Sequence, residues 1–139
     1  MKSIFAFFFS TFALYAADIT VTVTNCKSNN GKLLSSLHDN AKTFPIKPDK
    51  AFKRRVVAAR KGTLTLAFND IPPGKYAIAT IHDENGNGRL DANLIGIPKE
   101  GVGASRGAKG RFGPPEFKDA AFEIKSTIEK KEISIQLQY

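Results

Sequence analysis

Residues 62–81 read GTLTLAFNDIPPGKYAIATI, and this stretch decides the fold. In its first part Leu64, Leu66 and Phe68 alternate with small or polar residues, a pattern typical of a half-buried β-strand. Residues 69–74 then concentrate the residue types that form turns. Residues 75–81 carry apolar side chains at both odd and even positions, which is expected of a central strand. The stretch therefore predicts two consecutive strands joined by a tight turn.

The same reading extends outward over the rest of the chain. Residues 19–24, ITVTVT, are β-branched throughout and alternate with period two. A chain of 139 residues has room for one domain with one core, and we find no helical periodicity. Seven short strands separated by turn signals predict a single all-β sandwich. The expected strands are residues 19–24, 32–38, 51–60, 63–68, 75–81, 121–125 and 133–139.

Residues 1–16 have the composition of an export signal. A single charge at Lys2 precedes an apolar, Phe-rich run, and cleavage is expected after Ala16. The apolar run is shorter than the roughly 20 residues that span a bilayer. We therefore expect a mature domain of residues 17–139 without a transmembrane segment, monomeric, and periplasmic or secreted. Loss of Lys2 lowers the formal net charge from +8 to +7.

The strand pattern stops across residues 84–119. This segment holds eight of the eleven glycines, so its backbone takes turns that strands do not. Large apolar residues are nevertheless spaced through it, and such residues are scarce in disordered segments. They are Leu94, Ile95, Ile97, Phe112 and Phe117. We expect an ordered long loop that packs across one end of the sandwich and carries the function.

The loop begins with a motif typical of Ca²⁺ sites. Counting from Asp83, oxygen-bearing side chains stand at positions 1, 3, 5 and 9, a glycine stands at position 6, and a carbonyl is available at position 7. The predicted ligands are Asp83, Asn85, Asn87, the Arg89 carbonyl and Asp91, with Gly88 at the turn. Position 12 is Leu94 and not the usual glutamate, so another group must complete the shell.

Glu84 and Glu100 are both candidates for that group, and the sequence does not choose between them. Two assured carboxylates predict weak binding, with a Kd of roughly 10⁻⁴ to 10⁻³ M. An alternative interpretation is that the Asn and Asp side chains cap backbone amides of a hairpin turn.

Other chemistry is less well supported by the residue pattern. A small metal-dependent hydrolase would use Asp83, His82 and Asp91, but zinc catalysis needs three protein ligands and neither histidine has a second one nearby. Ser105 lies in a Gly-x-Ser-x-Gly sequence that lacks the strand-to-helix setting of a nucleophile elbow. Cys26, the single cysteine, is expected to be a buried thiol.

A basic stripe lies between Lys42 and Lys61. Eight lysines and arginines there face one acid, Asp49. In an exported protein such a stripe suits anionic envelope surfaces or anionic glycans, and not nucleic acid. It is also typical of an edge strand that lysines protect from aggregation. The basic residues are Lys42, Lys47, Lys50, Lys53, Arg54, Arg55, Arg60 and Lys61.

Residues 62–81 are similar to the strand, Pro-Gly turn and Tyr-bearing strand of prealbumin-like (transthyretin-like) sandwiches, including the collagen-binding-protein B-type repeats, in which the following loop can hold Ca²⁺. The mature chain also resembles a family of exported bacterial proteins catalogued as a domain of unknown function. That resemblance rests on HDENGNGRLD at 82–91, GIPKEG at 96–101, AKGRFGPP at 108–115 and FKDAAF at 117–122. It implies the fold and no activity. We expect a non-catalytic envelope module with a binding or structural role.

Overall fold

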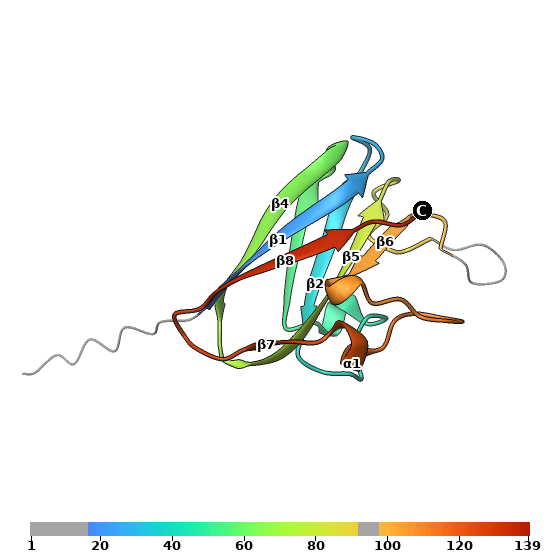
Figure 1. Ribbon diagram of the computed structural model, residues 1–139. Coiled ribbons are helices and arrows are strands. Elements are labelled where there is room, and N and C mark those ends of the chain that lie inside the picture. Colours follow the sequence, from blue (N-terminus) through green and yellow to red (C-terminus); the bar gives the residue numbers. More distant parts are fainter. Residues whose placement is uncertain (1–16, 92–97) are drawn as a thin grey trace, which may run out of the picture.

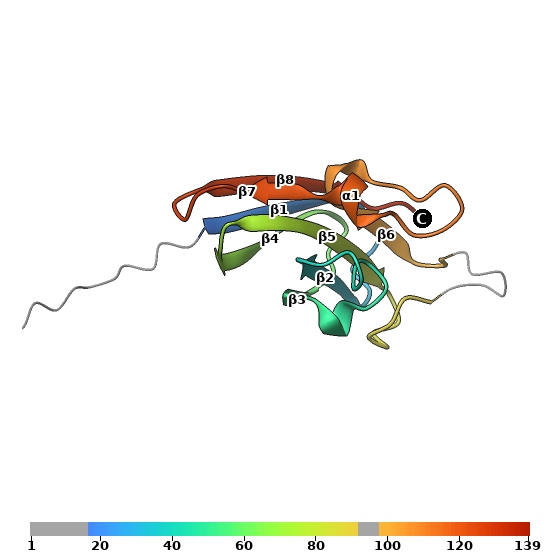
Figure 2. The ribbon, with the colours of Figure 1, turned by 90° about the horizontal axis from the view of Figure 1, so that it is seen from below.

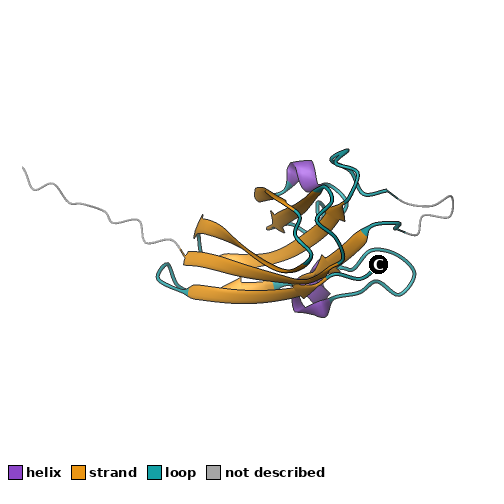
Figure 3. Ribbon diagram, turned by 90° about the horizontal axis from the view of Figure 1, so that it is seen from above, coloured by secondary structure: helices purple, strands orange, loops and turns teal. Residues whose placement is uncertain are grey.

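The structure, a computed structural model, describes residues 17–91 and 98–139 (Figure 1). The expected export signal, residues 1–16, lies outside the described residues, as do Leu94, Ile95 and Ile97. The described chain is predominantly β-strand, arranged as two sheets in a sandwich-like architecture (Figure 3). The prediction of an all-β fold is therefore confirmed.

The first sheet has three strands in the order β4 (Gly62–Ile71), β1 (Ala17–Cys26) and β8 (Lys130–Gln136). Strand β1 runs antiparallel to β4 and parallel to β8. Its alternation of β-branched residues places Ile19, Val21 and Val23 entirely out of solvent, while Thr22 and Thr24 are partly exposed. The period-two pattern thus gives β1 one buried face, as predicted.

The second sheet has five antiparallel strands. Four follow the order β3 (Lys53–Ala58), β2 (Lys32–His38), β5 (Gly74–Asp83) and β6 (Gly101–Ala104), and β7 (Phe122–Ile124) pairs with the beginning of β5. Figure 2 shows the two layers from the side, with β8 and β1 in one and β2 and β3 in the other. β5 therefore pairs directly with three other strands of this sheet, β2, β6 and β7.

Strand β5 is buried on both faces, as its sequence predicted. Tyr76 and Ile78 belong to the main core between the sheets, and Ala77 and Ala79 belong to a second apolar cluster on the outer face. Phe44, Ala104 and Ala120 complete the buried part of that second cluster, with Phe117 packed against it. The main core combines residues of both sheets, including Ile19, Val21, Leu33, Leu37, Phe68, Ile124, Ile135 and Leu137.

The expected count of seven strands is wrong, because the structure has eight. All seven expected strands are present, and the additional strand is β6 inside the expected loop 84–119. Its sequence, GVGA, offers too few apolar side chains for a period-two signal. The glycines instead permit close approach: a Cβ on Gly103 would stand 2.5 Å from Cγ2 of Ile135 on β8.

Of the five apolar residues expected to anchor that segment, the structure describes two, Phe112 and Phe117. Phe117 is half-buried against Phe44, but Phe112 is 97 % exposed and anchors nothing. Ser105 is fully buried; its hydroxyl donates to the Ala120 carbonyl at 2.7 Å and accepts from Ile78 N–H at 2.9 Å. Ser105 therefore ties the segment to β5 as a structural residue.

The helical elements are single turns: η1 (Pro48–Lys50), η2 (Ser105–Gly107) and α1 (Phe117–Ala120). Within residues 17–91 and 98–139, none of these helices has the length and apolar character needed to cross a membrane.

Replacing Ile78 with Ala is expected to destabilise the protein by about 2–5 kcal/mol, because the fully buried side chain leaves a cavity between the sheets. Urea unfolding measures the change. Ile128→Ala is the matched control, since Ile128 is 74 % exposed and its loss should cost no more than about 0.5 kcal/mol. Equal effects of the two substitutions would contradict the assigned core.

Candidate metal centre

Strand β5 ends at Asp83, which is the deepest residue of the candidate site. The side chain is 1 % exposed because the turn that joins β1 to β2 lies against the end of β5. Gly31 in that turn approaches the carbonyls of Asp83 and Glu84 so closely that a Cβ would collide with them. Asp83 Oδ2 accepts a hydrogen bond from Gly88 N–H at 2.7 Å. Oδ1, although buried, has no hydrogen-bond partner among the described residues.

The turn after β5 brings Asp91 back towards Asp83. Gly88, with a φ of 78°, takes the left-handed conformation at the position where the motif requires a glycine. Two amide side chains hold the returning carboxylate: Asn85 Nδ2 donates to it at 2.6 Å, and Asn87 Nδ2 donates at 2.9 and 3.1 Å. These hydrogen bonds, those from Asn87 first, lower the pKa of Asp91, so the group stays ionised.

Glu100 enters the site from the residue before β6. It is 5 % exposed and accepts from two backbone N–H groups, Glu84 at 2.7 Å and Asp91 at 3.0 Å. Lys99 N–H donates to the Asp91 carbonyl at 2.8 Å, which is a further hydrogen bond between the turn and the residues before β6. The pairing of β6 with β5 thereby fixes Glu100 beside the turn that follows β5.

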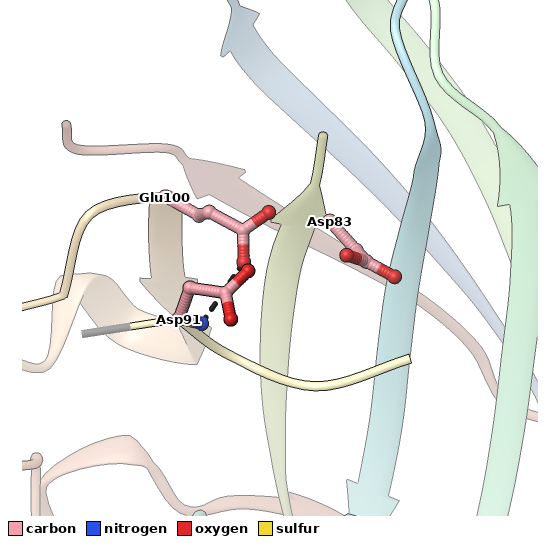
Figure 4. A group of neighbouring side chains, drawn as sticks. All are labelled: Asp83, Asp91 and Glu100. Atoms are coloured by element: carbon pink, nitrogen blue, oxygen red, sulfur yellow. Dashed lines mark hydrogen bonds between the residues drawn. The ribbon is translucent and has the colours of Figure 1, made fainter. Parts of the chain in front are cut away.

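Three carboxylates meet at this end of the sandwich (Figure 4). One oxygen from each of Asp83, Asp91 and Glu100 lies within 4.8 Å of the other two. Oxygens bound to one Ca²⁺ at about 2.3–2.6 Å can be up to about 5 Å apart, so the spacing fits a shared ion. Burying like charges together costs free energy unless a cation or hydrogen bonds compensate them.

The structure chooses between the two glutamates that the sequence left open. Glu100 joins the carboxylate group, whereas the carboxylate of Glu84 pairs with Lys27 at 3.1 Å. Reasoning from the sequence alone could not make this choice, because it requires the register of β6 against β5 and β6 itself was not predicted. The glutamate missing from position 12 of the motif thus has a candidate substitute in Glu100, the residue before β6.

The side-chain oxygens of Asn85 and Asn87, two further predicted ligands, accept hydrogen bonds from the backbone of the turn. Asn85 Oδ1 accepts from Asn87 N–H at 3.2 Å, and Asn87 Oδ1 accepts from Arg89 N–H at 2.9 Å. These are the capping hydrogen bonds of the alternative interpretation of the loop. The capping hydrogen bonds are compatible with the carboxylate group. The side-chain oxygens of the asparagines cap the backbone, while their Nδ2 groups hold Asp91 near Asp83 and Glu100.

His82 does not join the carboxylates. It precedes Asp83 on β5, so its side chain points to the opposite face of the sheet. Its Nε2 donates to the Asn30 carbonyl at 2.8 Å, and its Nδ1 accepts from the Tyr139 hydroxyl at 2.7 Å. The buried thiol of Cys26 lies 3.7 Å from the same Nδ1. The hydrolase alternative therefore lacks its histidine at the site.

The basic stripe of residues 42–61 follows one edge of the five-stranded sheet. β3 pairs with β2 on one side only, and Arg54 and Arg55 are exposed on it. Within the described part of the chain, no residue of the stripe forms an ion pair. Lys53 is partly structural, because its ammonium donates to the Asn69 carbonyl on β4.

Comparison with known proteins identifies a family. The family model described as "uncharacterized protein conserved in bacteria (DUF2141)" matches residues 21–132. The chain belongs to this family. The matched range in this DUF2141 member contains Asp83, Asp91 and Glu100. No curated protein and no solved structure matches the chain.

Replacing Asp83 with Asn is expected to stabilise the cation-free protein by about 1 kcal/mol. The substitution removes one of three neighbouring negative charges and therefore relieves their mutual repulsion. Oδ1 of the asparagine still accepts from Gly88 N–H. Chemical unfolding in the presence of a chelator measures the effect. Asp49→Asn, at an exposed position, is the control. A loss of stability in the Asp83 variant would contradict the proposed repulsion.

Proposed function

We propose that this DUF2141 protein is an exported, non-catalytic β-sandwich module of the cell envelope whose Asp83–Asp91–Glu100 group binds Ca²⁺. Two observations on Asp83 carry the proposal: its Oδ1 is buried and lacks a hydrogen-bond partner in the described chain, and its carboxylate has an oxygen within 4.8 Å of oxygens of Asp91 and Glu100. A buried charge without compensation is costly, and a cation would compensate it.

The ligand chemistry favours Ca²⁺ over other common cations. The group offers oxygen ligands only, whereas Zn²⁺ prefers histidine and cysteine, and both His82 and Cys26 face the other side of β5. Mg²⁺ requires a strict octahedron and gives up water reluctantly. Three carboxylates in place of two support a Kd near 10⁻⁴ M, the tighter end of the range expected from the motif.

A cation at this position would serve the structure of the loop. The cation would link three parts of the chain: the end of β5, the turn at residues 84–91 and the start of β6. The proposal of export rests on the composition of residues 1–16. A prealbumin-like arrangement is supported by the two-sheet architecture and by the Pro-Gly turn between β4 and β5. The direction of His82, away from the acids, supports the proposal of a non-catalytic role.

Ca²⁺ is expected to raise the melting temperature, and Mg²⁺ at the same concentration to raise it much less. At 10 mM, about 100 times a Kd of 10⁻⁴ M, Ca²⁺ adds about 2.7 kcal/mol to the free energy of unfolding by mass action. Differential scanning calorimetry measures both responses. Asp83→Ala and Glu100→Gln should abolish the Ca²⁺ response, and Glu123→Gln, at the exposed position of β7, should keep it. Identical melting curves with and without Ca²⁺ would refute the proposal.

A second candidate function is binding of an anionic glycan along the basic stripe. The observation that favours it is the absence of ion pairs: the cationic groups of residues 42–61 have no acidic partner in the part of the chain that the structure describes. Free cations on an open sheet edge are available to a polyanion. The competing explanation is that they keep the β3 edge from pairing with another chain.

Reversing Arg54, Arg55 and Arg60 to Glu separates these two explanations. The change lowers the formal net charge from +8 to +2 and should abolish retention on a heparin column, which in the parent protein should weaken as salt rises. Lys75, Lys125 and Lys130, all exposed, are reversed in a control with the same net charge. Retention that falls equally in both variants would mean that total charge, and not the stripe, binds the glycan.

A further inference from the structure

A cavity opens beside the carboxylate group. It has a volume of about 510 Å³ and is lined by Lys27, Glu84, Asn85, Asp91, Lys99 and Glu100. Two of the three candidate ligands, Asp91 and Glu100, therefore face this cavity, while Asp83 lies buried beneath them. The cavity is shallow and open to solvent, so it leaves room for an acidic group that approaches from outside.

Two lysines stand on the wall of this acidic cavity. Lys27, which follows β1, is held by the Glu84 carboxylate at 3.1 Å and by the Tyr139 ring, whose centroid is 4.6 Å from the ammonium. One of its three N–H donors is thus used, and two remain. Lys99 is exposed and is placed by its own N–H, which donates to the Asp91 carbonyl. The contacts of Lys27 with Glu84 and of Lys99 with Asp91 therefore hold both lysines beside the candidate site.

The charge of the cavity depends on the cation. With no cation bound, Glu84, Asp91 and Glu100 outnumber the two lysines, and an acid would be repelled. A bound Ca²⁺ offsets two of the three negative charges of Asp83, Asp91 and Glu100. With Glu84, Lys27 and Lys99 included, the formal charge of the site then rises from −2 to 0. It takes six to eight oxygens, and the three carboxylates offer one each, so several positions remain for other oxygens. Those on the side of Asp91 and Glu100 face the cavity and the lysines.

We propose that the cavity binds an oxyanion, a carboxylate or a phosphate of a small acidic molecule, by bridging it between the bound Ca²⁺ and the ammonium groups of Lys27 and Lys99. The inference rests on the proposed Ca²⁺ site and assigns that site a ligand class. The cation supplies coordination to one oxygen, and each lysine supplies a charge-assisted hydrogen bond to another. Binding of the acid is therefore conditional on Ca²⁺.

Isothermal titration calorimetry with two acidic sugars tests the inference. Galacturonate presents a carboxylate and glucose 6-phosphate presents a phosphate, and galactose and glucose are their neutral counterparts. Each is titrated into the full chain with saturating Ca²⁺ and with a chelator. We expect heat from at least one acid in the presence of Ca²⁺, no heat with the chelator, and none from either neutral sugar. The acid that binds identifies the source of the oxyanion.

Single substitutions show whether the lysines take part. Lys27→Ala and Lys99→Ala should each weaken binding of the acid about tenfold, the size of one charge-assisted hydrogen bond. Ca²⁺ affinity should be retained or slightly raised, because a positive charge near the ion is lost. Lys125→Ala, on an exposed residue outside the cavity, should change neither.

The outcomes distinguish this inference from the function on which it rests. Failure of Ca²⁺ itself to bind would overturn both. Normal Ca²⁺ binding without any binding of the acids would overturn the oxyanion site and leave the metal centre standing. Equal binding of an acid with and without Ca²⁺, or equal affinity in the lysine variants, would overturn the bridging geometry.

Discussion

The burial of β5 on both faces is the constraint on which the rest of the structure depends. Its Tyr76 and Ile78 contribute to the core between the sheets, and its Ala77 and Ala79 contribute to the outer cluster. Three other strands pair with it, β2 along one edge and β6 and β7 in succession along the other. A strand held in this way has little freedom in register or direction. Asp83, its last residue, is consequently placed at a defined depth, and the turn that follows must begin from there.

The sequence predicted the strands well where side chains alternate and poorly where the backbone itself makes the contact. β1 and β4 show period two because each has one buried face. β6 is held by its ladder with β5 and by the close approach of Gly103 to β8, and neither leaves a hydrophobic pattern. The same limit applies to the site. The motif predicted Asp83 and Asp91 from spacing along the chain, but Glu100 arrives through strand pairing, and spacing cannot choose it over Glu84.

The buried carboxylate of Asp83 costs folding free energy in the cation-free protein. Glu100 and Asp91 satisfy their oxygens with backbone and amide donors, but one oxygen of Asp83 is left without a donor in the described chain. An asparagine could fill the same space without a charge. The proposed Ca²⁺ would account for a buried carboxylate at this position, because its binding would recover the cost. The capping hydrogen bonds of Asn85 and Asn87 hold the turn in shape before the ion arrives, so less ordering remains to oppose binding.

The overall charge of the protein bears on both proposed ligands. A formal net charge of +8 repels Ca²⁺ at long range and attracts anions. At physiological ionic strength this field is screened over about 8 Å, so the cation responds mainly to the three carboxylates near it. An acidic molecule would experience the opposite balance: the positive surface would draw it to the protein, and the excess of acids over lysines at the cavity would repel it until the proposed Ca²⁺ is bound. Metal binding would then switch one cavity from repelling acids to binding them, without any movement of the strands that surround it.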